Sequence, residues 1–339
     1  MYYPTERRMV AQALPLTNST VNRFSNIFPL DGTGWTKMIL TFHATIDWTN
    51  AVVVDRLSVY RWIKGILLRT SRGETIVDNV PGNAFHFQNA WDNGVPPRHD
   101  LVIGADGVYD ATVEIAFARQ ELNRPEDLIF ASGRYSNLQL DITTGSVLDV
   151  LNDAVGETIA VTMDIEIEST FSALAPDGKG LPFAHAYYKT YGPMLYSTQN
   201  YFDLESSLDL GLFGFAIKVG GTGTMTCQFD GIGVDGHLTQ LTFRDSVRRW
   251  VDNALPIGLK QKLNTKVCFD PHNIYIATPT AVEQIAYPFI GWYGHDFVQF
   301  GSINEHYATG KKSLIRVEYT DGTTTDLASL LVWGFRTLR

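Results

Sequence analysis

Short stretches in which apolar and polar residues alternate recur along almost the whole chain, and turns rich in Gly and Pro separate them. From Leu40 to Ile46 apolar and polar residues alternate, and a period of two returns in 108–117, 135–143 and 159–167. Successive side chains of a strand point to opposite faces of a sheet, so this period predicts half-buried β-strands. Residues 61–77, with a Gly-containing turn in the middle, predict a hairpin.

The pattern predicts about sixteen short strands in two similar sets. One strand with its loop uses about 11 residues. Two eight-stranded units therefore fit in 339 residues, with room for long loops. A parallel α/β fold is disfavoured because only 147–155 and 246–254 resemble helices, and both are short. The predicted fold class is all-β: two eight-stranded antiparallel jelly rolls in tandem, with short helices in loops.

Turn residues suggest how the chain is divided. Residues 1–36 contain three prolines and no clear period, which predicts an irregular N-terminal arm. We expect a first jelly roll in 37–168 and a second in 201–339, which superpose as two eight-stranded sandwiches with the same strand order. Residues 169–200 combine Pro and Gly turns with an aromatic stretch, which predicts a packed connector containing the domain boundary.

Composition and charge exclude several classes of protein. The net charge is −9 and the basic residues are scattered, which argues against a dedicated nucleic-acid binder. No apolar run approaches the roughly 18 residues of a spanning helix, and the first residues lack the apolar core of a secretory signal. Charged residues make up only 19% and aromatic residues 12%, which favours a surface that neighbouring chains cover.

The sequence contains no convincing catalytic centre. Residues 231–236 match the spacing of a dinucleotide-binding loop, but an alternating strand pattern follows where a helix is needed. Tyr307 and Lys311 have the spacing of a catalytic Tyr-Lys pair without a dinucleotide domain to support them. Cys227 and Cys268 match no metal or disulfide spacing, so we expect buried thiols. We predict no enzyme activity, catalytic residue, cofactor or metal site.

One row of acidic residues leaves an alternative open. Asp164, Glu166 and Glu168 lie on one face of a predicted strand, because side chains two positions apart share a face. Their oxygens could bind Ca²⁺. A solvated sheet face, whose like charges discourage unwanted pairing, is the favoured interpretation.

Two longer segments carry a resemblance to a known family. Residues 63–87, IKGILLRTSRGETIVDNVPGNAFHF, combine a strand, a polar Gly turn and a short apolar run; residues 113–145 end in the strand YSNLQLDIT. A weaker counterpart, GKKSLIRVEYTDG, lies at 310–322. In these segments the chain resembles the double jelly-roll major capsid proteins of the adenovirus and tailless, membrane-containing bacteriophage lineage.

The resemblance implies a structural virion protein, made in the host cytoplasm. Three chains would form a pseudo-hexagonal trimer that tiles an icosahedral shell over an internal membrane. The implied partners are other copies and neighbouring capsomers, penton and minor capsid proteins, and membrane lipids, with no sequence-specific nucleic acid. Arg7 and Arg8, the basic pair of the predicted arm, would then face the membrane or a neighbouring subunit.

Two alternatives belong to other classes. A carbohydrate-binding or glycoside-processing β-sandwich would use exposed aromatic pairs, such as Tyr187-Tyr188 and Trp292-Tyr293, as sugar platforms. A phage tail or baseplate component would also be all-β and oligomeric.

Overall fold

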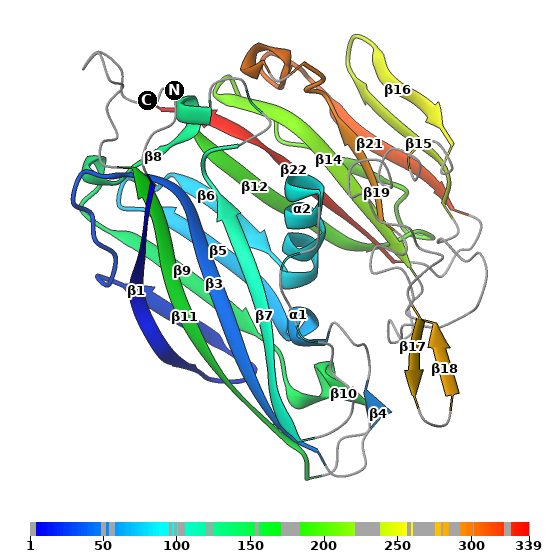
Figure 1. Cartoon of the computed structure of the whole chain (residues 1–339). Helices are drawn as coiled ribbons and strands as arrows, with labels where there is room; N and C mark the ends of the chain where they lie inside the picture. The colour runs from blue at the N-terminus through cyan, green and yellow to red at the C-terminus, as the bar shows by residue number, and fades with distance from the viewer. Residues whose placement is uncertain are drawn as a thin grey trace.

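The computed structural model describes residues 5–48, 52–53, 58–94, 97, 100, 106–119, 122, 125–152, 156–170, 184–220, 238–255, 259, 275–278, 281–284, 292–300, 302–321 and 327–338. Two sandwiches of antiparallel strands lie side by side in it (Figure 1). We refer to them as the first roll and the second roll.

Eight strands make the first roll, in two sheets of four. One sheet has the order β1 (Thr5–Leu16), β11 (Thr158–Thr170), β3 (Gly34–Asp47), β7 (Gly107–Ala116). The other has the order β2 (Val21–Ser25), β9 (Leu138–Thr144), β5 (Ile63–Thr70), β6 (Thr75–Val80).

The second roll repeats this arrangement. One sheet has the order β12 (Ala184–Leu195), β22 (Leu327–Thr337), β14 (Leu210–Gly220), β19 (Trp292–Asp296), and the other β13 (Tyr201–Asp203), β21 (Ile315–Asp321), β15 (Leu238–Asp245), β16 (Arg249–Ala254). Numbered along the chain, the main strands of each roll follow the order 1-8-3-6 in one sheet and 2-7-4-5 in the other. The predicted identity of strand order is confirmed, and the order is that of a jelly roll.

The remaining elements are short. They are β4 (Val52–Val53), β8 (Phe130–Ala131), β10 (Leu151–Asn152), β17 (Tyr275–Thr278), β18 (Ala281–Gln284), β20 (Tyr307–Ala308), the helices α1 (Ser58–Trp62) and α2 (Gly82–Asn93), and the 3₁₀ turns η1 (Pro125–Leu128), η2 (Ser132–Arg134), η3 (Val147–Asp149) and η4 (Ile303–Glu305). Within the described residues, no helix combines the length and apolar character needed to cross a bilayer.

The two rolls share a sheet, a connection that the sequence pattern does not predict. β6 of the first roll and β12 of the second run parallel and pair at two positions, Tyr188 with Val77 and Lys189 with Asp78. This contact merges two four-stranded sheets, with β20 added beside β14, into one sheet of nine strands. Edge strands expose unpaired backbone groups, so joining two edges satisfies both.

The irregular arm predicted for residues 1–36 is wrong for most of its length. β1 is the first strand of the first roll and pairs with β11, and β2 pairs with β9. The alternation is hard to read because irregularities interrupt β1 twice, between Met9 and Ala11 and between Ala11 and Leu14. Each bulge shifts the side chains that follow it, which breaks the period of two.

The predicted connector, 169–200, also holds regular structure. β11 extends to Thr170, and residues 184–195 are β12, the first strand of the second roll. Its aromatic side chains Tyr187 and Tyr188 are buried. The aromatic stretch is therefore core of the fold, because β12 has neighbouring strands on both sides.

The helices differ from prediction in two ways: the structure contains a long helix that the sequence does not predict, and neither predicted helix is present as an α-helix among the described residues. The sequence around 80–87 predicts a turn and a strand, yet Gly82–Asn93 is the longest described helix. It is buried on nearly all sides, so it has no polar stripe to give a helical period. Residues 249–254, inside the predicted helix 246–254, are strand β16, and 147–155 holds η3 followed by β10.

α2 packs on the second roll and connects the two halves (Figure 1). Phe87 stacks on Trp292 with ring centroids 4.6 Å apart, and Trp91 meets Trp333 edge-on at 6.1 Å. Trp91 also donates a hydrogen bond from Nε1 to Asp296, at 3.0 Å. Gly294 makes room for this helix, because a Cβ there would lie 2.7 Å from the Trp91 ring.

Side chains close the free edge of β7. Backbone carbonyls of alternate residues accept hydrogen bonds from three elements, namely Thr112 from Tyr60 Oη, Glu114 from Asn89 Nδ2 and Ala116 from Tyr188 Oη. The Asn89 Oδ1 also accepts from the backbone N–H of Glu114, at 2.9 Å. The edge therefore presents few unpaired groups to another strand.

We predict that Trp91→Ala lowers the free energy of unfolding by about 3–5 kcal/mol, because it leaves a cavity between the rolls and removes the hydrogen bond to Asp296. Urea denaturation followed by circular dichroism measures the change. The control Val108→Ala alters a side chain that is 58% exposed, and should change stability by no more than about 0.5 kcal/mol. Equal effects of the two substitutions would contradict the packing described for α2.

Candidate functional site

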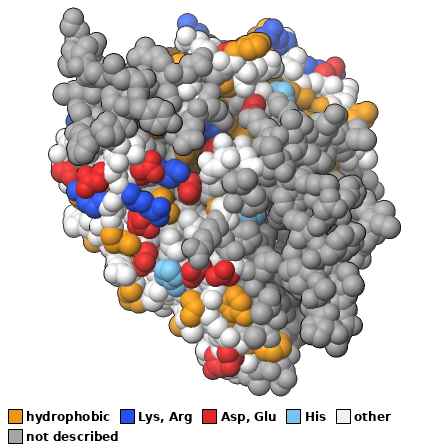
Figure 2. Space-filling view, in the orientation of Figure 1, with side chains coloured by type: hydrophobic (Ala, Val, Ile, Leu, Met, Phe, Trp, Pro, Cys, Tyr) orange, Lys and Arg blue, Asp and Glu red, His pale blue; other side chains and the backbone are white. Residues whose placement is uncertain are grey.

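Charged side chains gather on the outer face of the β1–β11–β3–β7 sheet. Figure 2 shows acidic and basic groups mixed on this side of the first roll. Along β11, buried residues alternate with partly exposed ones, and Asp164, Glu166 and Glu168 all fall in the partly exposed set. The prediction that these three carboxylates share one face is confirmed.

Protein groups bind each carboxylate of this row. Glu166 forms a two-bond ion pair with Arg7, with Nη2 2.9 Å from Oε1. Asp164 accepts the backbone N–H of Ala13 at 2.7 Å. Glu168 accepts a long hydrogen bond from Thr36 Oγ1 at 3.4 Å. In the part of the chain that the structure describes, no group of three or more His, Cys, Asp or Glu side chains is placed to hold a metal ion.

Arg7 and Arg8 lie on a strand and not on a free arm. Arg7 reaches across to Glu166 on the neighbouring β11. Arg8 binds Asp31 through Nη1, at 2.9 Å, whereas its Nε and Nη2 are buried and have no hydrogen-bond partner in the part of the chain that the structure describes. The sequence cannot reveal these contacts, because they follow from the register between β1 and β11.

His43 connects three strands of the same face. From β3, its Nδ1 lies 2.7 Å from Asp110 on β7, and its Nε2 lies 3.4 Å from Asp164 on β11. Burial alone would lower the pKa of this imidazole, but the hydrogen bond and charge of Asp110, with those of Asp164, raise it above the ordinary value. The protonated ring therefore joins two carboxylates that would otherwise repel each other.

Asp245 organises the turn between β15 and β16. Its side chain is fully buried and accepts five hydrogen bonds or ion contacts, from the backbone N–H groups of Val247 and Arg248, Trp250 Nε1, Tyr307 Oη and Lys312 Nζ. Burial would raise the pKa of this carboxyl, but these donors, Trp250 first, hold it far below its ordinary value. The turn and the start of β16 are thus fixed by one ionised group.

This network also accounts for Tyr307, which the sequence places four positions before Lys311. The Tyr307 hydroxyl donates to Asp245 at 2.7 Å. Burial, together with that hydrogen bond, raises the pKa of the phenol, so it stays protonated and serves structure. The hydroxyl of the Tyr307-Lys311 spacing is thus committed to the buried carboxylate of Asp245.

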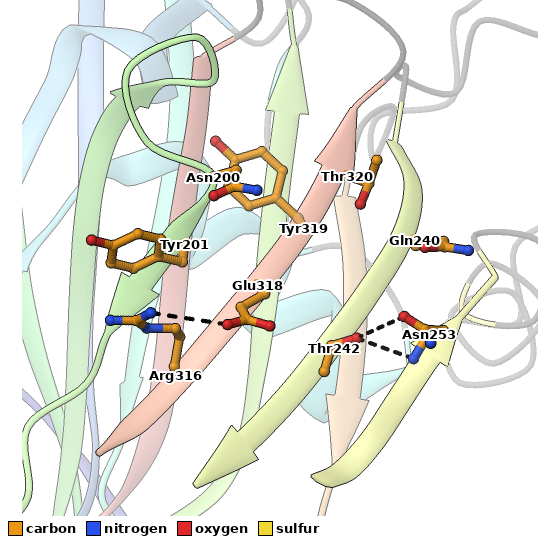
Figure 3. Close-up of a pocket in the computed structure, with 9 residues that line it drawn as sticks. All are labelled: Asn200, Tyr201, Gln240, Thr242, Asn253, Arg316, Glu318, Tyr319 and Thr320. Atoms are coloured by element: carbon orange, nitrogen blue, oxygen red, sulfur yellow. Dashed lines mark hydrogen bonds and ion pairs between the residues drawn. The ribbon is translucent and has the colours of Figure 1, made fainter. Parts of the chain in front are cut away.

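A shallow polar hollow lies on the outer face of the β13–β21–β15–β16 sheet (Figure 3). Its lining residues are Asn200, Tyr201, Gln240, Thr242, Asn253, Arg316, Glu318, Tyr319 and Thr320. Arg316 lies over the Tyr201 ring at 3.7 Å, and Arg244 binds Glu318. Glu318 is the only carboxylate among these lining residues, whereas glycoside hydrolysis generally needs two.

The aromatic pairs required by the carbohydrate alternative are buried. Tyr187, Tyr188, Trp292 and Tyr293 are each no more than 4% exposed. They pack in the cores of the rolls or against α2 and cannot stack on a sugar at the surface. The sugar-platform interpretation of these pairs is therefore wrong.

Three features noted in the sequence lie outside the described residues. They are the glycine motif at 231–236, Cys227 and Cys268.

A repeated tripeptide is the signal that sequence reasoning missed. Val77-Asp78-Asn79 lies in β6, and Val251-Asp252-Asn253 lies at the corresponding place in β16. Both asparagines have a positive φ, 55° for Asn79 and 47° for Asn253, a conformation that Asn tolerates better than most residues. The identical letters align the two halves once β6 and β16 are known to occupy equivalent places in the two rolls.

Comparisons with known proteins agree on the fold. Neither protein-family models nor curated sequences match the chain. Among solved structures, it is similar to the STIV MCP, the major capsid protein of Sulfolobus turreted icosahedral virus, with 13% identity and a TM-score of 0.67 over 98% of this chain and 97% of that one. The major capsid protein P2 of bacteriophage PM2 is similar at 9% identity, a TM-score of 0.58 and coverages of 99% and 98%.

The Faustovirus major capsid protein gives 8% identity, a TM-score of 0.57 and coverages of 100% and 91%. Each match spans both rolls and the junction between them. The class defined by strand order and by these matches is the double jelly roll. This chain has that fold, as its sequence pattern predicts.

We predict that stability depends on pH through His43. The pKa of His43 is raised in the folded protein, so its protonated form stabilises the fold. This stabilisation is complete below the unfolded pKa of about 6.5 and is lost as the pH rises through the folded pKa. Unfolding free energies of the wild type and His43→Gln should differ most near pH 5.5, with the wild type more stable, and converge in alkaline solution. A difference that grows with pH would contradict the arrangement with Asp110 and Asp164.

We predict that Asp245→Asn destabilises the protein by about 3–5 kcal/mol at pH 7, because three side-chain donors lose a buried charged acceptor. The lowered pKa stabilises the fold above the unfolded value of 3.8 and ceases to do so as pH falls through the folded pKa, so the difference should shrink in acid. Thermal or urea denaturation measures it. The exposed Asp252→Asn is the control and should change stability by at most about 0.5 kcal/mol; a similar loss in both variants would contradict the network.

Proposed function

We propose that this chain is a viral major capsid protein with a purely structural role. The observation that carries the proposal is the tandem of two complete jelly rolls, fused by the β6–β12 contact and by α2 into one unit. The end-to-end similarity to the STIV and PM2 capsid proteins supports it. In this role the protein belongs to the virion and acts without a cofactor or catalytic residue.

The duplicated fold suits a pseudo-hexagonal building block. A chain with two similar rolls presents two similar outlines, so three chains place six rolls around one axis. We propose that such trimers tile an icosahedral shell over an internal membrane. Their partners are neighbouring capsomers, penton and minor capsid proteins, and membrane lipids, and not a specific nucleic-acid sequence.

Exposed apolar residues at one end of the second roll support burial by a partner. Leu208 is 78%, Val247 75% and Phe300 81% exposed. They lie in the connections β13–β14, β15–β16 and β19–β21, which the alternating strand directions bring to one end of the roll. Several large apolar side chains exposed at one end are typical of a surface that becomes covered.

We predict that the purified protein is a trimer of about three times the chain mass of 37.8 kDa, because obligate interfaces of about 2,000–5,000 Å² hold such subunits together. Light scattering coupled to size exclusion measures the mass, and negative-stain microscopy should reveal hexagonal outlines. A stable monomer at micromolar concentration would contradict the capsid role; rings or fibres would favour a tail or baseplate component instead.

A further inference from the structure

Irregularities in the sheets align the two rolls residue by residue. The pairing of β1 with β11 is irregular across 11–14, and that of β12 with β22 across 191–194, each time with two residues bulged opposite one. At the start of these bulges, Ala11 pairs with Ile165 and Tyr191 pairs with Leu330. Two residues further along β11 and β22, Ile167 pairs with Arg8 and Val332 pairs with Lys189. Arg8 is therefore the counterpart of Lys189.

A second irregularity supports this alignment. The pairing of β11 with β3 shifts between Glu168 and Ser169, and that of β22 with β14 shifts between Trp333 and Gly334. Both shifts lie at the same distance along the strand from the first bulge. Because two independent bulges coincide, the register of one roll on the other is fixed.

The repeated tripeptide aligns β6 with β16 in the same way. Val77 pairs with Leu68 of β5, and Val251 pairs with Phe243 of β15. In both hairpins the pairing shifts on each side of this position. Asp252 is therefore the counterpart of Asp78.

Within the chain, the two aligned positions meet at the junction of the rolls. Lys189 pairs with Asp78 along the parallel β6–β12 contact, and its Nζ lies 3.0 Å from the Asp78 carboxylate. The contact joins the fifth main strand of one roll to the first main strand of the next.

The same two strands are free at the opposite ends of the molecule. Among the described strands, β1 ends the sheet of the first roll and β16 ends the sheet of the second. Arg8 on β1 is partly exposed and binds Asp31 through Nη1. Its Nε and Nη2 are buried and have no hydrogen-bond partner among the described residues, so the side chain must turn outward to reach a neighbouring copy. Asp252 on β16 is largely exposed, and so is Arg249, with which it forms an ion pair at 3.0 Å. Such surface pairs contribute little to stability.

We propose that a second copy of this chain docks with its β1 beside β16, parallel and in the register of the β6–β12 contact, so that Arg8 of one copy binds Asp252 of the other. This contact between two chains has equivalent strands and the same register as the β6–β12 contact within one chain. The contact is head-to-tail, because it joins two different surfaces of the chain. Such contacts form a closed ring when the rotations between successive copies add up to a full turn. The inference rests on the proposed capsid function and specifies its interface.

The contact between copies differs in chemistry from the contact within the chain. Gly294 and Trp333 lie beneath α2 on the outer face of the second roll. In the alignment of the two rolls, their counterparts in the first roll are Glu114 and Glu168. The apolar packing of Phe87 and Trp91 on Trp292 and Trp333 therefore has no counterpart on that charged face. The contact between copies therefore depends on strand pairing and charge, and should weaken with salt.

A charge exchange tests the pair. Arg8→Asp and Asp252→Arg should each raise the concentration at which trimers dissociate about tenfold or more, and the double variant, which restores opposite charges, should recover most of the loss. Sedimentation at several salt concentrations measures this. Arg72→Asp, the same charge change on the turn between β5 and β6, is the control and should leave assembly unchanged; circular dichroism establishes that each variant is folded.

Cross-linking tests the register. The double variant Arg8→Cys, Asp252→Cys should form a disulfide between chains under mild oxidation and give covalent trimers on a denaturing gel, while each single variant and the pair Arg72→Cys, Asp252→Cys should not. If wild-type trimers form but the charge exchange gives no rescue and the cysteines do not cross-link, the contact is wrong and the capsid function stands. If the wild type is a monomer, the capsid function fails, and the contact with it.

Discussion

The packing of α2 on the outer face of the second roll is the contact on which the rest of the structure depends. The helix belongs to the first roll by sequence, yet its largest side chains, Phe87 and Trp91, pack against the second. On its other side, Asn89 closes the edge of β7 with two backbone hydrogen bonds. One element thus joins two sandwiches and removes an edge that could aggregate, so neither roll keeps its native surface without the other.

The fold could be predicted from the sequence where side chains obey a simple period. β3, β7, β9 and β11 alternate between core and surface, and this alternation with turn spacing was enough to indicate two eight-stranded rolls. β1 could not be read, because its bulges change which face each residue points to. α2 could not be read either, because burial on all sides removes the polar stripe that identifies a surface helix.

The candidate site was predictable to a smaller extent. Alternation places Asp164, Glu166 and Glu168 on one face, but their partners Arg7, Ala13 and Thr36 come from strands whose register is decided by tertiary contacts. The five donors around Asp245 likewise converge from three segments. Only the repeated Val-Asp-Asn was visible in the letters, and its meaning depended on knowing that β6 and β16 occupy equivalent places.

The position of α2 in the chain also sets the order of events during translation. Asp296, which accepts the Trp91 hydrogen bond, lies 205 positions after it. At a synthesis rate of about 5–20 residues per second, the ribosome needs on the order of 10–40 s to make that partner. Throughout that interval the apolar side chains Phe87 and Trp91 of α2 lack the second-roll residues that cover them. Folding of the first half is therefore completed only when the last strands emerge, and a cell that makes many copies at once must shield this helix, by chaperones or by slow initiation, until they do.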